Sequence, residues 1–309
     1  MKKVVLFAAV LALATTAFAK TIKVGIINND PSESGYRSAN VADMKNTFTK
    51  KNGYNAKFTY SLDNEVQIAA AKKYIQDDVD YLLISAAAST GWDTVLKDAK
   101  KAGIKVILFD RLIETSEDMY LAAIVSDMPK EGETAVNWLA SQGLAEYNIV
   151  HIQGAMGSDA QLGRSGALDA KVKAEKNWNY VTQQTATWSA ETAQQIVQAV
   201  IDSGKKFNVI YAENDGMAQG AVAALDKANI SHGVGKDVIV MGFDCNKWAL
   251  EELLAGRWNY DGQCNPFQAA EIDKLIKSGK KPANKIIYSV EKGFDAKTIT
   301  KDDVNKYGI

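Results

Sequence analysis

Two hydrophobic periodicities alternate along the chain. Short runs of apolar, often β-branched residues, bounded by Gly, Asn or Asp, are typical of strands buried on both faces. They predict strands at Ile22–Ile27, Tyr81–Ile84, Lys105–Phe109, Ile149–Ile152, Val209–Tyr211 and Val238–Met241. Between them, apolar residues recur at helical spacing, as in the segments that begin at Val66, Ala193 and Val222. This alternation of strand and helix predicts parallel sheets with helices on both faces.

The number of predicted units is too large for one sheet of ordinary width. A first series runs from Ile22 to about Val125, and a second runs from about Tyr147 to about Arg257. No Pro- or Gly-rich linker separates the two series, so we expect a short hinge of crossing strands and no flexible tether. The predicted fold class is therefore α/β, with two doubly wound parallel-sheet lobes joined by that hinge.

The first residues have the pattern of an export signal. Met1-Lys2-Lys3 precedes a short apolar run, and the small residues that follow end in an Ala-x-Ala sequence at Ala19. This arrangement predicts a signal peptide over residues 1–19, cleaved after Ala19. The alternatives are a buried first helix or a membrane anchor, but a bilayer span needs about 20 apolar residues. We expect the mature protein to be exported, most simply to a bacterial periplasm.

Composition and charge limit the partners. The chain is 47% hydrophobic and 24% charged, with a formal net charge of −1, as in ordinary globular proteins. No excess of Lys and Arg is present to suggest a nucleic-acid partner. Two cysteines, Cys245 and Cys264, are too few for a disulfide scaffold. In an oxidising compartment they form either one bridge or two separate buried thiols, and sequence alone leaves both possibilities open.

Polar and aromatic side chains follow almost every predicted strand. In an open parallel sheet, the loops at the carboxyl ends of the strands converge on the ligand-binding crevice. In chain order these loops carry Ser32-Glu33-Ser34-Gly35-Tyr36-Arg37, Ser89-Thr90-Gly91-Trp92, Asp110-Arg111, Gln153-Gly154 with Gln161 and Arg164 downstream, Thr187-Trp188, Glu213-Asn214-Asp215, and Asp244.

These residue types suit a sugar. Each sugar hydroxyl donates and accepts hydrogen bonds, so a dry site needs carboxylates and amides as acceptors and Arg or Asn as donors. The charge-assisted bonds would come from Asp110, Arg111, Arg164 and Asp244. Aromatic rings such as Tyr36, Trp92 or Trp188 would cover the apolar face of a sugar ring. No P-loop or G-x-G-x-x-G follows the first strand, which argues against a nucleotide.

Each of these residues also has a purely structural interpretation. Asp110 and Arg111 are able to form a surface ion pair of little energetic worth. Asn214 and Asp215 stand where a helix cap belongs, and we expect Asp215 to be the cap and Asn214 to contact the ligand. Trp92 and Trp188 are alternatively core aromatics. In the structural interpretation, the loop at residues 32–37 does no more than begin a helix, with a serine as its N-cap.

At these motifs the chain resembles the sugar-binding proteins of bacterial ABC importers, in the ribose-binding-like branch. The similarity extends over most of the mature chain. It rests on Leu108-Phe109-Asp110-Arg111, Gln153-Gly154 with Arg164, Asn214-Asp215-x-Met217-Ala218-x-Gly220-Ala221, and Gly242-Phe243-Asp244. Within that branch, Ser32-Glu33-Ser34-Gly35-Tyr36-Arg37 and Thr90-Gly91-Trp92 look most like galactofuranose-binding proteins.

The resemblance implies a type I periplasmic binding protein and a role for each matching residue. Lobe one would comprise residues 20–125 plus about 262–290, and lobe two residues 126–261 plus about 291–309. Sugar-binding residues would be Glu33, Tyr36, Arg37, Asp110 and Arg111 from lobe one, and Arg164, Asn214 and Asp244 from lobe two, with Trp92 and Trp188 as aromatic candidates. Related proteins often carry Gln where this chain has Cys264, two residues before Pro266. Cys264 would then lie near the cleft, where a bridge to Cys245 would help shape it.

The implied mechanism is hinge closure around a monosaccharide, an aldose in pyranose or furanose form. The closed form would be recognised by an ABC transporter permease, with a chemoreceptor as an alternative partner. The resemblance implies a monomer that needs no cofactor or metal and performs no catalysis.

Two other classes of protein fit less well. An exported carbohydrate-active enzyme would use Asp110 and Asp244 as a glycosidase pair, but Arg111 and Arg164 would oppose the raised pKa that a general acid needs. His151 and His232 belong to no catalytic motif, since G-x-S-x-G and H-E-x-x-H are both absent. A transcription repressor with a similar core would need a basic helix-turn-helix of about 50–60 residues before the first strand, which we do not expect here.

Overall fold

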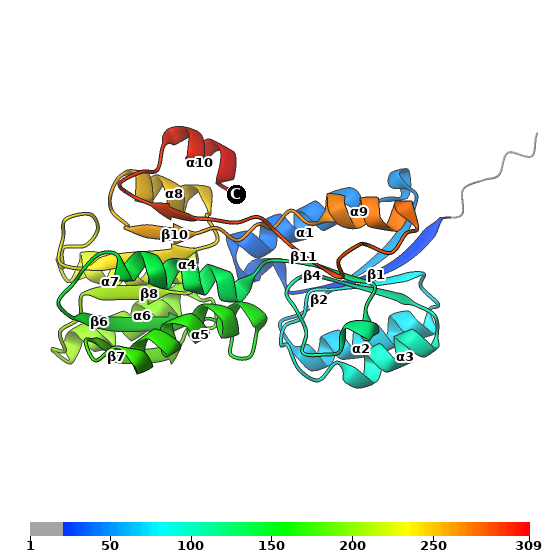
Figure 1. Ribbon diagram of the computed structural model, residues 1–309, viewed down its shortest axis with the longest axis horizontal. Helices are drawn as coiled ribbons and strands as arrows, with labels where there is room; N and C mark the ends of the chain where they lie inside the picture. The colour runs from blue at the N-terminus through cyan, green and yellow to red at the C-terminus, as the bar shows by residue number, and fades with distance from the viewer. Residues whose placement is uncertain (1–20) are drawn as a thin grey trace, which may run out of the picture.

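The computed structural model describes residues 21–309, so the predicted signal peptide lies outside the described residues. Within this range, two six-stranded sheets lie side by side, each flanked by helices, and extended segments pass from one to the other (Figure 1). The fold class predicted from the alternating periodicities is confirmed. None of the helices in the described part of the chain is long and apolar enough to cross a bilayer.

The first sheet has the strand order β11-β5-β4-β3-β1-β2, with every neighbouring pair parallel. Its strands are β1 (Ile22–Asn28), β2 (Tyr54–Tyr60), β3 (Tyr81–Ile84), β4 (Lys105–Asp110), β5 (Ala122–Val125) and β11 (Ile286–Tyr288). Its helices are α1 (Gly35–Thr47), α2 (Asn64–Gln76), α3 (Asp93–Lys101) and α9 (Ala269–Ser278), with short 3₁₀ turns at η1 (Pro31–Glu33), η2 (Lys50–Asn52) and η3 (Glu117–Met119).

The second sheet repeats this plan, with the order β12-β10-β9-β8-β6-β7. Its strands are β6 (Tyr147–Gln153), β7 (Trp178–Thr185), β8 (Val209–Ala212), β9 (Ile239–Phe243), β10 (Tyr260–Gly262) and β12 (Gly293–Asp295). Only β12 is antiparallel to its neighbour, β10. The helices are α4 (Met128–Ala140), α5 (Asp159–Ala174), α6 (Ala190–Asp202), α7 (Asp215–Lys227), α8 (Lys247–Leu254) and α10 (Lys301–Tyr307).

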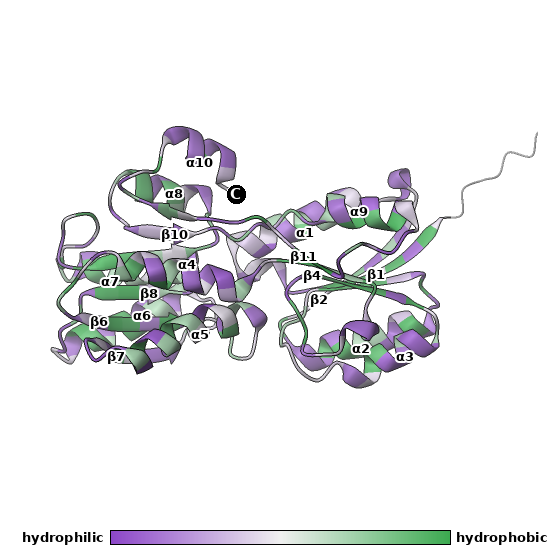
Figure 2. Ribbon diagram, in the orientation of Figure 1, coloured by the Kyte–Doolittle hydropathy of each residue, from purple (hydrophilic) through white to green (hydrophobic). Residues whose placement is uncertain are grey.

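Helices cover both faces of each sheet. Successive side chains along a strand point to opposite faces, and each face packs into its own apolar layer. In β3, Leu82 and Ile84 pack under α2 and α3, whereas Tyr81 and Leu83 pack under α1 and α9. In the second sheet, α6, α7 and α8 cover one face, and α4 and α5 cover the other. Apolar colour is accordingly concentrated in the strands and on the inner sides of the helices (Figure 2).

Three segments cross between the sheets. Ser126 and Asp127 connect β5 to α4, residues 263–268 connect β10 to α9, and residues 289–292 connect β11 to β12. The C-terminal part of the chain therefore adds one edge strand to each sheet, and neither sheet is built from a continuous stretch of sequence (Figure 1).

The sequence patterns located most of the central strands but missed the interior strands β5 and β10 and the edges. The six predicted strands overlap β1, β3, β4, β6, β8 and β9, and each end agrees within two residues. The edge strand β2 has partly exposed residues along most of its length, so its sequence lacks the continuous apolar run that marks a buried strand. The edge position of β2 is thus the physical reason why that pattern is missing.

Candidate ligand-binding cleft

A pocket lies between the two sheets, where the loops at the carboxyl ends of both sets of strands face each other. It is lined by Glu33, Ser34, Tyr36, Asp110, Arg111, Met128, Ala160, Arg164, Trp188, Asn214, Asp244 and Cys264. Eight of the ten predicted binding residues are among them. The positions follow from topology, because parallel strands deliver all their carboxyl ends to one edge of each sheet.

Asp110 is the centre of the first half of this pocket. It ends β4 and is fully buried, and its carboxylate accepts hydrogen bonds from Tyr36 Oη at 2.7 Å and Ser85 Oγ at 2.6 Å. The Nη2 atom of Arg37 lies 2.7 Å from Asp110 Oδ2, and Arg111 Nε lies 3.6 Å from the same oxygen. Burial disfavours the charged form, but the two guanidinium groups outweigh it and hold the pKa of Asp110 below its usual value.

Arg37 differs from the prediction. It is buried beneath the pocket and does not line it. Its Nε donates to Glu33 Oε2 at 2.9 Å, and its Nη1 donates to Asn28 Oδ1 at 2.8 Å. Arg37 therefore orients Glu33 and Asp110, and its place on the ligand side is taken by Arg111, whose Nη2 lies 3.5 Å from Glu33 Oε2.

Arg164, on α5, is the corresponding centre of the second half. Its Nε donates to Glu131 Oε2 at 2.8 Å, its Nη1 donates to the carbonyl oxygen of Glu213 at 2.5 Å, and its Nη2 donates to Asp244 Oδ1 at 3.1 Å. The guanidinium carbon also lies 4.7 Å from the ring centre of Phe243. These partners fix the guanidinium plane, so its direction is set before any ligand arrives.

The pKa of Asp244 is shifted in the opposite direction to that of Asp110. Burial raises the pKa of Asp244 to about 6, despite the neighbouring Arg164. Behind it, burial together with the charge of Asp244 raises the pKa of Asp261 to about 8. Burial and the nearby Asp261 likewise raise the pKa of Asp215 well above its usual value. Asp244 and the two carboxyl groups behind the pocket thus outnumber the one guanidinium group of the second lobe that lies beside them, Arg164.

Trp188 forms an aromatic wall of the pocket. It is 6% exposed, and the guanidinium of Arg111 lies 5.9 Å from its ring centre. The ring passes over Gly154, where an added Cβ would lie 1.9 Å from the indole. Only glycine leaves room at that position, which explains the Gln153-Gly154 motif at the end of β6.

Several pocket residues have strained backbones. Asp110, Trp188 and Asp244 have φ angles of 65°, 70° and 107°, a region that residues other than glycine rarely occupy. Such residues persist where the surrounding structure holds them, and they cluster at ligand sites. Here the strained conformation turns each side chain from the end of its strand into the cleft.

The two halves touch each other directly. The backbone nitrogen of Leu112 donates to Asp159 Oδ2 at 2.8 Å, and the backbone nitrogen of Ser89 donates to the carbonyl oxygen of Gly157 at 3.0 Å. Tyr36, from the first half, packs into the apolar cluster of the second. The cavity that remains is about 20 Å³, compared with about 10–15 Å³ for one water molecule. A monosaccharide therefore enters only if the lobes separate.

Trp92 requires a correction. Its side chain is 1% exposed, packs in the core beside α2 and α3, and donates from Nε1 to the carbonyl oxygen of Ala88 at 3.0 Å. It lies outside the pocket. A sequence pattern that places Trp after a strand cannot separate a ring that turns into the cleft from one that turns under the following helix.

The capping role expected of Asp215 at the start of α7 belongs to Asn214. Asn214 is the helix cap, because its side-chain oxygen accepts from the backbone nitrogen of Met217 at 2.8 Å, although it also lines the pocket. Asp215 is fully buried, and its Oδ2 accepts from the backbone and side-chain nitrogens of Asn246 at 2.7 and 3.0 Å. Asp215 therefore ties α7 to the loop after β9.

The suggested disulfide is absent from the described residues. Cys245 and Cys264 are both free and buried. Cys264 lines the pocket, so the cleft contains a thiol there. Met128 and Ala160 also line the pocket, and no polar or aromatic signal marked them in the sequence.

The histidines have structural partners outside the pocket. His151 Nε2 lies 2.9 Å from Glu213 Oε1 inside the second lobe, and His232 lies 2.9 Å from both Asp226 Oδ1 and the carbonyl oxygen of Arg257. Neither histidine lies against a hydroxyl or thiol that lines the cleft. The groups in the cleft are thus arranged to hold a polyhydroxylated ligand through ion-paired hydrogen-bonding side chains.

Two doubly wound lobes that close over a polar, aromatic-walled cleft define a solute-binding protein. The chain belongs to the family described as periplasmic binding protein domain, whose pattern matches residues 19–272. The galactofuranose-binding protein YtfQ of Escherichia coli is 27% identical over 281 residues, covering 88% of this chain and 87% of that protein.

Solved structures show the same likeness over nearly the whole chain. The binding protein of the arabinose ABC transporter from Shewanella, bound to α- and β-L-arabinofuranose, superposes with a TM-score of 0.83 at 26% identity, covering 92% of this chain and 95% of that one. A protein from Mycobacterium smegmatis in complex with β-D-fucofuranose has a TM-score of 0.82 at 30% identity, covering 93% and 96%.

Proposed function

We propose that this protein captures a monosaccharide in furanose form in the cleft and delivers it to the permease of an ABC importer, without chemical change to the sugar. The observation that carries the proposal is the facing pair of charge-fixed clusters, Asp110 with Arg111 and Asp244 with Arg164, beside the Trp188 ring. Together they supply donors, acceptors and an apolar wall for one small ring. The furanose form is supported by the relatives named for, or bound to, furanoses.

The mechanism follows from the division of the site. Each cluster belongs to one sheet, so we propose that residues 20–125 with about 262–290 and residues 126–261 with about 291–309 move as two lobes. A sugar that contacts both clusters stabilises the closed form, and the interlobe contacts of Leu112 and Ser89 add to it. We propose that the closed monomer is the form that the permease recognises, outside the cytoplasm after cleavage following Ala19.

A thermal-shift screen tests the ligand class. The mature protein is melted with D-galactose, L-arabinose, D-fructose and D-ribose, with adenosine and L-leucine as controls for other ligand classes. D-Glucose, which forms almost no furanose in water, is the matched control for ring form. We expect a saturable rise in melting temperature with at least one furanose-forming sugar, because a ligand that binds only the native state stabilises it.

Each other outcome has a definite meaning. A shift with adenosine or L-leucine alone would keep the fold assignment and overturn the sugar proposal. An equal shift with D-glucose would overturn the furanose preference. Turnover of a sugar or an oligosaccharide by the protein would contradict the proposal that the sugar is delivered without chemical change.

A further inference from the structure

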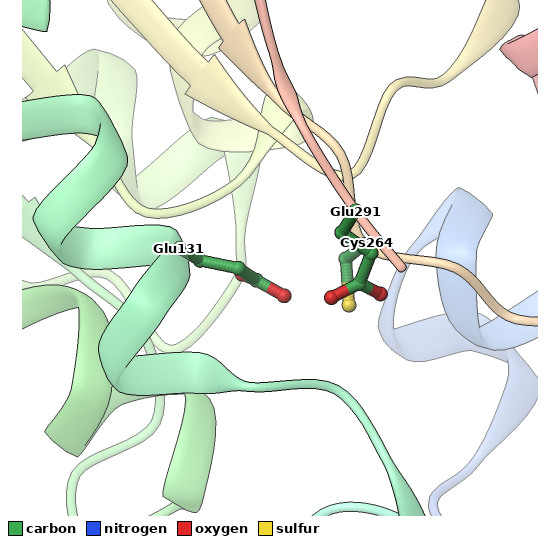
Figure 3. Close-up of side chains that lie close together, drawn as sticks. All are labelled: Glu131, Cys264 and Glu291. Atoms are coloured by element: carbon green, nitrogen blue, oxygen red, sulfur yellow. The ribbon is translucent and has the colours of Figure 1, made fainter. Parts of the chain in front are cut away.

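Three metal-ligating side chains meet at the hinge. Glu131, Cys264 and Glu291 each offer a donor atom, and these atoms all lie within 4.8 Å of one another. The side chains come from three separate segments and converge on one point (Figure 3). Glu131 is in the first turn of α4, just after the first crossing, whereas Cys264 and Glu291 are on the second and third crossings. Two of the three connections between the lobes thus contribute a donor, and the third donor comes from the helix that follows the first connection.

Glu131 has an oxygen that nothing else uses. Its Oε2 accepts from Arg164 Nε at 2.8 Å, but its Oε1 is buried and has no hydrogen-bond partner among residues 21–309. The residue is 6% exposed. Its carboxylate is directed toward Cys264 and Glu291 (Figure 3). A buried carboxylate oxygen without a partner is costly, and a cation is one group that would satisfy it.

The other two side chains are held in place but still have donor capacity. Glu291 Oε1 accepts from Ser126 Oγ at 2.7 Å and from the backbone nitrogen of Asn265 at 2.6 Å. Its second oxygen remains available. The sulfur of Cys264 lies 3.5 Å from the same Ser126 Oγ. The serine hydroxyl and the backbone amide thus position the ligands from behind, as outer partners do in metal sites.

We propose that Glu131, Cys264 and Glu291 bind one Zn²⁺ ion, with water as the fourth ligand. A set of one thiolate and two carboxylates suits a borderline-soft ion that accepts four ligands, whereas Mg²⁺ and Ca²⁺ require more ligands, all of them oxygen. A cavity of about 180 Å³ adjoins the cluster, lined by both glutamates, and provides the water and an entry path. The argument for the ion does not depend on the identity of the sugar, although Cys264 also lines the cleft and Glu131 holds Arg164.

The distances agree with a tetrahedral ion after a small adjustment. Zn²⁺ binds sulfur at about 2.3 Å and carboxylate oxygen at about 2.0–2.2 Å, so its ligands lie about 3.5 Å apart. The donors, within 4.8 Å of one another, need to approach by about 1 Å, which side-chain rotation of two glutamates provides. Once the thiol and the two carboxyl groups release their protons to bind the ion, their three negative charges are balanced by Zn²⁺ and the neighbouring Arg164.

Binding of Zn²⁺ alone to the reduced mature protein, stripped with EDTA and dialysed, tests the site. Titration calorimetry and metal analysis after gel filtration should give one Zn²⁺ per chain with micromolar or tighter affinity. Cys264→Ser and Glu291→Gln should each weaken binding at least tenfold. Cys245→Ser, which removes the other buried thiol away from the cluster, is the matched control and should bind as the wild type does.

A second measurement shows directly whether the sulfur of Cys264 binds the metal ion. Co²⁺ in place of Zn²⁺ should give a thiolate-to-cobalt charge-transfer band in the wild type and in Cys245→Ser, and none in Cys264→Ser. Circular dichroism melts confirm that each variant is folded. The proposal is overturned if the wild type does not bind Zn²⁺. It is also overturned if folded Cys264→Ser and Glu291→Gln bind Zn²⁺ as tightly as the wild type does. Sugar binding measured in the same metal-free protein shows whether the proposed function stands by itself.

Discussion

Asp244→Asn separates the ligand-binding role of a residue from its role in stability. The substitution preserves shape and removes one charge at the end of β9. With the lobes closed and no ligand bound, Asp244 is a buried acid whose pKa is raised to about 6, so its ionised form at neutral pH is unfavourable. Arg164 loses one partner but retains Glu131 and the carbonyl oxygen of Glu213. We therefore expect the ligand-free variant to be at least as stable as the wild type.

Sugar binding should respond in the opposite direction. A hydrogen bond to a charged group is worth about 1.5–3 kcal/mol, which corresponds to a loss of about 10- to 150-fold in affinity. Titration calorimetry with the sugar selected by the thermal-shift screen measures the loss, and urea unfolding of the ligand-free protein at pH 7 measures the stability.

Asp110→Asn is the matched comparison, because it makes the same change on the facing wall. The pKa of Asp110 is held low by Arg37 and Arg111, so neutralising it leaves two buried guanidinium groups undercompensated. Its ligand-free form should lose about 3 kcal/mol or more of stability, together with a similar loss of affinity. If both variants lose ligand-free stability equally, the electrostatic contrast between the two walls of the cleft is wrong.

Three further results are expected. The ligand-free protein should be more stable to urea at about pH 5 than at pH 8, because Asp261, with a pKa raised to about 8, binds its proton more tightly when folded; a midpoint that rises with pH would contradict this. Gly154→Ala should displace the Trp188 ring and cost about 1–3 kcal/mol of stability as well as sugar affinity, so unchanged calorimetry would exclude the clash. Asp159→Ala should remove an interlobe hydrogen bond and increase the radius of gyration of the ligand-free protein in solution scattering, and an unchanged radius would show that this contact does not hold the lobes.

The sequence located the residues whose position follows from topology alone. Asp110 and Asp244 end parallel strands, and the alternation of strand and helix is sufficient to place both at the cleft. The partners of Arg164 were not predictable in this way. Glu131 lies 33 residues before it, and Asp244 lies 80 residues after it. Neither separation leaves a local pattern, because the contacts arise only when α4 and α5 pack together and β9 takes its place in the sheet.

Aromatic residues show the other limit of prediction from sequence. Trp92 and Trp188 both follow strands, yet one ring packs under a helix and the other faces the cleft. Their destinations depend on backbone conformation, since Trp188 has a φ of 70° and Trp92 has a φ of −88°. A tryptophan in the left-handed region has no sequence signature, unlike Asn and Asp, which are enriched there. The same reasoning applies to Cys264, whose place in the cleft depends on the path of a crossing segment.

The late position of β11 and β12 in the chain has a consequence for folding. The edge strand β11 joins β5 through the pairing of Ile286 with Ala123, and β12 joins β10 only a few residues later. Until residues 286–295 are in place, β5 and β10 each lack the strand that covers their outer edge, and their backbone groups there are unpaired. Neither sheet therefore has its native set of strands until this late segment is in place. Removal of the segment after α9 should accordingly expose the edges of β5 and β10, and we expect the truncated protein to aggregate.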